Sequence, residues 1–285
     1  MFTSRWPADP KLVWVVEIHA HRAGPLSDGI AVHAEQTLPA FARTWSEQRV
    51  ACELDVRFTA DGVAVVFHDP DLTRMTGARG HLHELDAAAF KALRTDILGA
   101  ARRLALAAEP VPFATLEEVL RLARRHRGEL NVELKNLPGE PWFDATDTTA
   151  ERLATLLRGS RIAAHRLTVQ TFGDPDLAVL GRLLPGVRRS LLIEPGGEAH
   201  AIERALVAGA GAVGLAWPVS PDTVRRAHDH GLRVMAYTLN EPAAIRDACR
   251  AGVDVIITDD PSMAQRTLGR NPHRHRSATT GVVVA

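Results

Sequence analysis

Short apolar runs alternate with amphipathic stretches along most of the chain. The apolar runs show little polar alternation, which is typical of strands in a parallel sheet that helices cover. Each run is followed by a stretch with apolar residues at helical spacing. Eight such pairs predict an α/β protein with a (β/α)8 TIM barrel. The predicted strands are residues 13–18, 51–56, 130–135, 167–172, 188–194, 212–217, 233–239 and 253–258. The predicted helices are residues 33–47, 115–126, 146–158, 175–184, 198–208, 220–230, 241–251 and 261–268.

Two segments depart from this alternation. Asp61-Gly62 is a turn signal between two apolar runs, so residues 63–67 are predicted to return beside the second strand as a hairpin. Residues 71–111 are less regular and longer than an ordinary connection, which indicates a small insertion after strand two. We expect residues 1–268 to form one barrel domain and residues 269–285 to be a disordered C-terminal tail.

Composition narrows the class of protein. Lys and Arg number 34 and Asp and Glu number 34, so the formal net charge of 0 argues against a nucleic-acid binder. Cys52 and Cys249 are too few for a disulfide framework and are expected to be buried thiols. The first residues carry no signal-peptide pattern, and no apolar run reaches the roughly 18 residues that a membrane span needs. We therefore expect a soluble, cytoplasmic protein without stable membrane insertion.

Acidic side chains lie near the carboxyl ends of two of the predicted strands. Glu53 and Asp55 are two residues apart, so a strand projects both toward the same face, and Glu133 ends the next strand. In a TIM barrel these strand ends meet at the active-site face. Charged groups inside apolar strands are costly unless they are paired or bind a metal. The three carboxylates therefore predict a divalent metal site, for Mg²⁺ or Ca²⁺ and, less favoured, Mn²⁺.

Cationic side chains and histidines lie beside these carboxylates in the predicted fold. Arg22 and Lys135 would add fixed positive charge next to the metal, which favours a phosphate group as ligand. His21 and His68 approach from two different loops. Their unperturbed pKa lies near neutrality, so they are candidates for general acid and general base. The sequence does not assign the two roles between them.

Simpler interpretations exist for several of these residues. Glu53 and Asp55 could form a structural ion-pair cluster with Arg57, and His68 could cap a turn. His19 is expected to be a packed barrel residue. Asp259 is expected to cap the following helix rather than to bind metal. Trp217, at a strand end, could line the pocket or fill the mouth of the barrel.

The ordered series of motifs resembles the glycerophosphodiester phosphodiesterase family over roughly residues 13–268. This resemblance implies a TIM barrel with an insertion after strand two. It also implies hydrolysis of glycerophosphodiesters to sn-glycerol 3-phosphate and an alcohol with a divalent cation, a function in lipid and glycerol metabolism. The motifs are His21-Arg22, Glu35-Gln36-Thr37, Glu53 with Asp55, Asp61-Gly62, His68-Asp69, Glu133 to Lys135, Tyr237 to Asn240 and Gly252 to Pro261.

By motif, the resemblance assigns roles to individual residues. It implies Glu53, Asp55 and Glu133 as metal ligands, His21 and His68 as the acid–base pair, Arg22 and Lys135 as phosphate contacts, and Glu35 and Tyr237 as residues in or behind the pocket.

Three positions depart from the family pattern. The usual HisArgGly reads His21-Arg22-Ala23 here, with Gly24 after it. The usual GluAsnThr has Gln36 at its second position, and the common tryptophan on strand seven is Tyr237.

Two alternative functions stay open. A related barrel could act on lysophospholipids or on other phosphodiesters. A barrel with altered loops at Ala23 and Gln36 could bind phosphoesters without hydrolysing them. The expected partner is in each case a small phosphoester molecule, and the sequence leaves the oligomeric state open.

Overall fold

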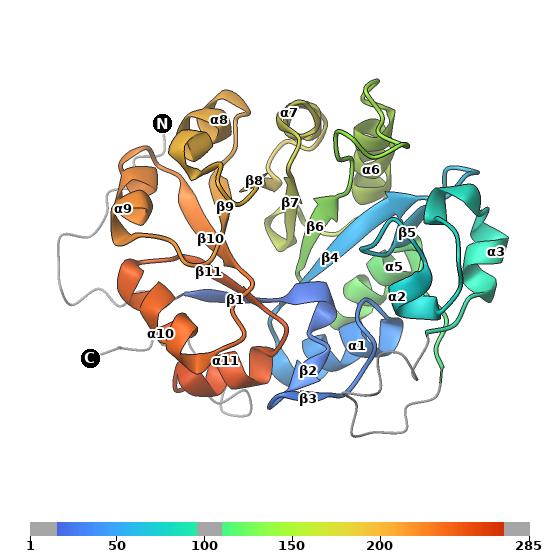
Figure 1. The fold of residues 1–285 in the computed structure, drawn as a ribbon, viewed down its shortest axis with the longest axis horizontal. Coiled ribbons are helices and arrows are strands. Elements are labelled where there is room, and N and C mark those ends of the chain that lie inside the picture. Colours follow the sequence, from blue (N-terminus) through green and yellow to red (C-terminus); the bar gives the residue numbers. More distant parts are fainter. Residues whose placement is uncertain (1–15, 96–109, 271–285) are drawn as a thin grey trace.

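Eight parallel strands form a closed barrel in the structure, a computed structural model that describes residues 16–95 and 110–270. The strands pair in chain order, and β1 pairs with both β11 and β4, which closes the barrel. The predicted TIM barrel is therefore confirmed (Figure 1). Its strands are β1 (Glu17–Ala20), β4 (Ala51–Phe58), β6 (Leu130–Leu134), β7 (Leu167–Thr171), β8 (Arg188–Ile193), β9 (Ala212–Ala216), β10 (Arg233–Tyr237) and β11 (Val255–Thr258).

Helices surround the strands on the outside of the barrel (Figure 1). Some of these helices begin at residues whose side chains cap them. Thr115 and Glu118 form a capping box at the first residues of α5, and the Ser220 side chain caps α9. The helices that follow the strands are α1 (Leu38–Arg43), α5 (Leu116–His126), α6 (Thr148–Gly159), α7 (Asp174–Leu183), α8 (Ala201–Val207), α9 (Pro221–Asp229), α10 (Pro242–Ala251) and α11 (Pro261–Thr267).

The helix predicted over residues 33–47 begins later than expected. It starts at Leu38 and continues as a π-helical turn over Thr44–Gln48. Residues 33–36 instead form a loop, because Gln36 adopts a left-handed backbone with φ of 58° and turns its side chain toward β4. A small hairpin of β2 (Leu26–Ser27) and β3 (Ile30–Ala31) also lies between β1 and α1.

The insertion lies where the sequence placed it, after the hairpin of β4 and β5 (Ala64–Val66). Its described part holds α2 (Thr73–Thr76) and α3 (Ala87–Ala92). Phe67 packs edge-on against Phe113 and Phe90, with ring centroids 5.1 and 5.9 Å away, so the insertion shares a small apolar cluster with the residues on either side of it. The remaining residues of the predicted insertion, 96–109, and most of the predicted tail, 271–285, lie outside the described residues.

The interior of the barrel changes from apolar to polar along its axis. Met235 and Val255 pack together in the interior, whereas Asn131 and Gln170 are joined by a buried hydrogen bond of 2.8 Å. Buried polar groups need hydrogen-bond partners, and these two residues supply them to each other. The polar part of the interior lies on the side of the carboxyl ends of the strands. Cys52 is buried as predicted, whereas Cys249 is only partly buried, and both thiols are free.

Membrane-spanning helices are a separate question. Within residues 16–95 and 110–270, none of the helices combines the length and the apolar character that crossing a bilayer requires.

Candidate active site

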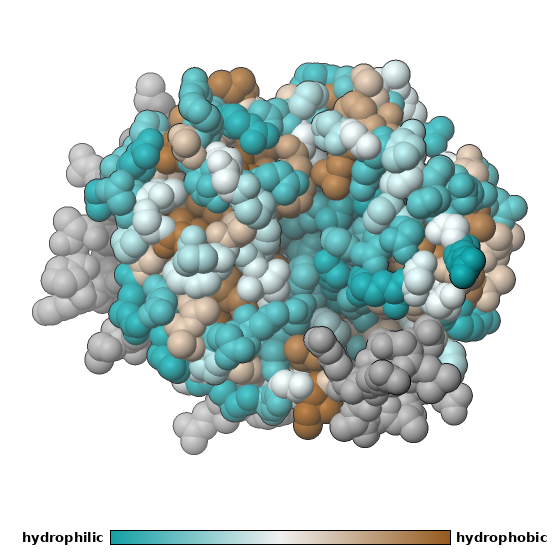
Figure 2. Space-filling model, in the orientation of Figure 1, coloured by the Kyte–Doolittle hydropathy of each residue, from teal (hydrophilic) through white to brown (hydrophobic). Residues whose placement is uncertain are grey.

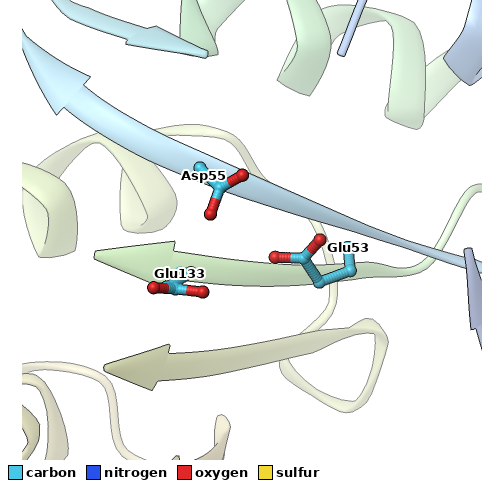
Figure 3. A group of neighbouring side chains, drawn as sticks. All are labelled: Glu53, Asp55 and Glu133. Atoms are coloured by element: carbon cyan, nitrogen blue, oxygen red, sulfur yellow. The ribbon is translucent and has the colours of Figure 1, made fainter. Parts of the chain in front are cut away.

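Three buried carboxylates meet at the carboxyl ends of β4 and β6. Glu53 and Asp55 project from the same face of β4, and Glu133 is the direct neighbour of Asp55 on β6. The three residues are 1%, 1% and 5% exposed. One oxygen of each lies within 4.8 Å of the others (Figure 3). The structure thus brings together the three acidic residues that the sequence singled out.

The three carboxylates carry more negative charge than the one lysine in contact with them can neutralise. Lys135 Nζ lies 3.0 Å from Asp55 Oδ1 and 2.6 Å from Glu133 Oε1. Burial raises the pKa of Asp55, but the Lys135 charge outweighs it and holds that pKa well below its usual range. Burial and the charge of Asp55 raise the pKa of Glu53 to about 8. A carboxyl with that pKa keeps its proton at neutral pH unless another cation is present.

A divalent cation would neutralise the negative charge that remains on the three carboxylates. The donors are all carboxylate oxygens, which suit Mg²⁺ or Ca²⁺. Arg57 does not compensate for the carboxylates, because its guanidinium forms a bidentate ion pair with Glu140 at 2.8 and 3.0 Å. The structural ion pair that was the simpler interpretation is therefore absent.

Arg22 contacts the cluster through both its backbone and its side chain. Its N–H donates to Glu53 Oε2 at 2.9 Å, and its Nε lies 3.6 Å from Asp55 Oδ2. Arg22, Ala23 and Gly24 all have left-handed backbones, with φ of 49°, 67° and 65°. Alanine at such a position costs roughly 1 kcal/mol. The turn nevertheless forms, so the change from glycine to Ala23 leaves Arg22 aimed at the carboxylates.

Glu35 lies behind Arg22 and is not part of the pocket lining. Arg22 Nη1 donates to Glu35 Oε1 at 3.1 Å. Arg74, from the insertion, donates to both Glu35 oxygens at 2.9 and 2.7 Å. Glu35 therefore links the insertion to Arg22, a contact that could not be read from sequence spacing.

Gln36 holds Asp55 in place and was missed as a functional candidate. Its Nε2 donates to Asp55 Oδ2 at 2.8 Å, and its Oε1 accepts the Asp55 N–H at 2.9 Å. Both residues are buried. The only sequence signal was the departure from asparagine at this position of the family motif.

We expect Gln36→Ala to destabilise the protein by about 2–4 kcal/mol, because it leaves the buried Asp55 N–H without an acceptor. Loss of the support for Asp55 should also weaken metal binding about tenfold. Urea unfolding and calorimetric metal titration measure the two effects. Gln36→Asn, which keeps an amide and tolerates the left-handed backbone, should recover part of both. Unchanged stability and metal affinity in Gln36→Ala would contradict this role.

Each candidate catalytic histidine is paired with an aspartate. His21 Nδ1 lies 2.6 Å from Asp259 Oδ1, and His68 Nδ1 lies 2.6 Å from Asp69 Oδ1. A carboxylate only accepts, so Nδ1 carries the hydrogen in both rings and Nε2 is left for another partner. Both histidines line the same cavity as the carboxylates.

The two histidines differ in their titration. Burial lowers the pKa of His21, but the hydrogen bond to Asp259 and the charge of Glu53 outweigh it, so the pKa is raised. Burial also lowers the pKa of His68, and there the hydrogen bond to Asp69 does not compensate, so the pKa falls.

The expectation that Asp259 caps the next helix is wrong. Asp260 is the cap of α11, where its Oδ1 accepts the Met263 N–H at 2.8 Å. Asp259 instead turns to His21 and is held there by Asn240, whose Nδ2 donates to Asp259 Oδ2 at 2.5 Å. Two adjacent aspartates carry the same capping signal, so the sequence could not separate them.

We expect Asp259→Asn to lower kcat about 10- to 100-fold, because an amide neither fixes the Nδ1 tautomer nor stabilises the imidazolium. The pKa of His21 should fall, and the limb of the pH–rate profile that reports His21 should move to lower pH. Rates measured from pH 5 to 10 test this. Asp229→Asn, on exposed surface at the end of α9, is the matched control. If kcat fell but the pH–rate profile did not shift, Asp259 would have only a structural role.

The site opens into a cavity of about 360 Å³ at the mouth of the barrel. The face in Figure 2 is hollowed near its centre, where hydrophilic residues gather. Tyr237 lines the cavity and donates from its hydroxyl to the Ile193 carbonyl at 2.8 Å. Trp217 packs against the apolar core instead, so of the two aromatic residues only Tyr237 belongs to the pocket.

A larger cavity, of about 600 Å³, lies at the amino-terminal end of the barrel. His19 lines this cavity and not the one that the carboxylates line, and it is buried, as expected for a packed barrel residue. Arg188 is paired there with Glu17 and Glu129 at 3.7 and 3.5 Å. Catalytic groups of this fold lie at the opposite face, so we place the active site in the smaller cavity.

A family profile, a curated relative and solved structures all point to the same protein family. The profile of the Glycerophosphoryl diester phosphodiesterase family matches residues 21–263. A glycerophosphodiester phosphodiesterase of Caldanaerobacter subterraneus is 26% identical, over 80% of this chain and 89% of that protein.

Solved structures show the same fold. A Silicibacter pomeroyi protein assigned to the glycerophosphoryl diester phosphodiesterases superposes with a TM-score of 0.77 at 29% identity, covering 89% of this chain and 93% of that one. An Oleispira antarctica phosphodiesterase, solved with its product sn-glycerol 3-phosphate, has a TM-score of 0.72 at 21% identity, covering 89% and 97%.

Proposed function

This chain belongs to the glycerophosphoryl diester phosphodiesterase family, a family of phosphoric diester hydrolases, and from this we propose that it hydrolyses glycerophosphodiesters to sn-glycerol 3-phosphate and an alcohol with a divalent cation. One observation carries the proposal. Three buried carboxylates, whose negative charge Lys135 offsets only in part, line a single cavity with two histidines that are each paired with an aspartate. The product bound by the Oleispira antarctica phosphodiesterase supports a small phosphoester as the ligand.

Glu53, Asp55 and Glu133 would hold the cation, which supplies Lewis-acid stabilisation of the phosphoryl oxygens when bound. Lys135 and Arg22 provide fixed positive charge for the phosphate. Arg22 Nε is buried and has no hydrogen-bond acceptor among the described residues, so it can donate to a phosphate oxygen.

The histidines would divide the two proton transfers. One Nε2 removes the proton from the attacking oxygen, which is water or the glycerol 2-hydroxyl. Attack by water gives sn-glycerol 3-phosphate directly, whereas attack by the 2-hydroxyl gives a cyclic phosphate, whose ring a water molecule must then open to give sn-glycerol 3-phosphate. The other donates a proton to the leaving alcohol oxygen. Asp259 and Asp69 hold the rings with Nε2 toward the cavity.

The non-catalytic alternative loses its support. It rested on altered loops at Ala23 and Gln36. The turn at Ala23 still directs the Arg22 N–H to Glu53, and Gln36 still binds Asp55. Both altered positions therefore keep the carboxylates in place.

Product analysis tests the proposed reaction. We expect ³¹P NMR of the protein with glycerophosphocholine and Mg²⁺ or Ca²⁺ to show sn-glycerol 3-phosphate. Accumulation of a cyclic phosphate would identify the glycerol 2-hydroxyl as the attacking group. Faster cleavage of a lysophospholipid than of glycerophosphocholine would favour the alternative substrate class, and no cleavage of either by the folded protein would contradict the proposal.

A further inference from the structure

The mouth of the barrel is chemically divided. The carboxylates of β4 and β6 occupy one part of the lining, together with cations and histidines from the segments that follow β1, β5 and β6. The part contributed by the following strands is mainly apolar. It consists of four apolar or aromatic residues, two uncharged polar residues and one acidic residue directly after β8: Phe172, Leu192, Tyr237 and Ile257, then Gln170 and Thr238, then Glu194. A phosphodiester bound at the metal cluster would therefore direct one substituent toward this apolar wall.

Two aromatic rings form a fixed corner in that wall. The rings of Phe172 and Tyr237 are perpendicular, with centroids 6.5 Å apart. The hydrogen bond from the Tyr237 hydroxyl to the Ile193 carbonyl holds the second ring in place. Lys135 Nζ lies 6.0 Å from the Phe172 centroid, so this ring already faces one cation. Aromatic faces attract ammonium groups by their quadrupole.

Glu194 is the anomalous member of the lining. An anionic substrate must enter this cavity, and an acidic side chain at its wall repels the phosphate. Glu194 is exposed and has no ion pair with Lys, Arg or His in the part of the chain that the structure describes. The Tyr237 hydroxyl binds the carbonyl of Ile193, the residue before Glu194, so Tyr237 and Glu194 belong to the same part of the cavity lining. The repulsion is offset if the substrate itself carries a positive charge.

We propose that Glu194, Phe172 and Tyr237 form a subsite for an ammonium-bearing alcohol, so that the preferred glycerophosphodiesters carry a cationic headgroup such as choline. This inference rests on the proposed function and specifies its leaving group. The carboxylate supplies the counter-charge, and the two rings enclose the methylated ammonium without needing a hydrogen bond. A cavity of about 360 Å³ lies within the range of small-ligand sites.

A competing role for Glu194 is a hydrogen bond to the glycerol part, which all these substrates share. Two substrates separate the roles: glycerophosphocholine, and glycerophosphoglycerol, whose leaving alcohol is uncharged. For the wild-type protein we expect kcat/KM to favour the choline diester about five- to tenfold. Glu194→Gln should lower kcat/KM for glycerophosphocholine by a similar factor and change that for glycerophosphoglycerol less than twofold. Phe172→Leu should lower the choline value about threefold.

Glu194 is exposed, so its substitution does not threaten folding. Glu203→Gln, with a side chain 80% exposed on α8, is the matched control and should change neither substrate. An equal loss for both substrates in Glu194→Gln, or no loss for either, would overturn the subsite. If the wild-type protein hydrolyses neither diester, the proposed function fails. In that case, calorimetry measures the affinity of the wild-type protein and of Glu194→Gln for the same two diesters. Tighter binding of glycerophosphocholine by the wild type, lost in Glu194→Gln, would still support the subsite, and equal affinities would overturn it.

Discussion

Alanine in place of His21 or His68 is expected to lower kcat for glycerophosphodiester hydrolysis by about 10²- to 10⁴-fold. General acid–base catalysis by a positioned imidazole contributes an acceleration of that size. Both rings line the cavity, and each is held by an aspartate 2.6 Å from Nδ1. Neither ring belongs to the apolar core, so the fold should be retained. Steady-state rates, with circular dichroism as the check on folding, measure the effect.

His200→Ala is the matched control, because the His200 side chain is 77% exposed and lies on the outer surface before α8. Its rate should stay within about twofold of the wild type. If His21→Ala and His68→Ala both kept wild-type rates, the acid–base assignment would be wrong. If only one of them lost activity, a single histidine would serve both proton transfers.

The substitution Glu53→Gln should separate metal binding from folding. Without metal, the raised pKa of about 8 means that Glu53 is protonated at neutral pH, and glutamine imitates that form. The folded protein holds this proton more tightly than the unfolded chain, whose pKa is near 4.5. This contribution to stability is therefore present below pH 4.5 and is lost as the pH rises toward 8.

We expect metal-free Glu53→Gln to be as stable as the wild type at pH 7 or more stable, by an order of 1–2 kcal/mol. Its affinity for Mg²⁺ or Ca²⁺ should fall at least about 100-fold, because one of three carboxylate ligands is gone. Urea unfolding in EDTA and in excess metal measures both effects. The wild type should gain stability from metal and Glu53→Gln should not.

Glu203→Gln, on exposed surface, should behave like the wild type in both conditions. A metal-dependent gain in stability that survives in Glu53→Gln would show that the ion binds elsewhere. A large loss of stability in the metal-free variant would show that Glu53 is a charged structural group and not a neutral one awaiting a cation.

The backbone periodicity explains why the metal cluster could be predicted. Residues two apart on a strand share a face, which relates Glu53 to Asp55, and parallel strands end together, which brings Glu133 beside them. The eight strands were recognisable for a related reason: they are buried on both faces and read as apolar runs.

The supporting contacts could not be predicted because they depend on loops. Gln36 was placed in a helix, and only its left-handed backbone lets it reach Asp55. Asp259 reaches His21 across 238 residues of sequence, and the adjacent Asp260 took the capping role instead. The hairpin of β2 and β3 did have a local signal, because Asp28-Gly29 lies at its turn.

The most direct test of the account is release of sn-glycerol 3-phosphate from glycerophosphocholine by EDTA-treated protein, before and after Mg²⁺ or Ca²⁺ is restored. The carboxylate cluster predicts negligible release in EDTA and recovery with added metal, and no recovery in Glu53→Gln. Release that continues undiminished in EDTA would contradict a metal-dependent reaction at these three carboxylates. So would a folded, metal-loaded protein that releases no glycerol phosphate from any glycerophosphodiester.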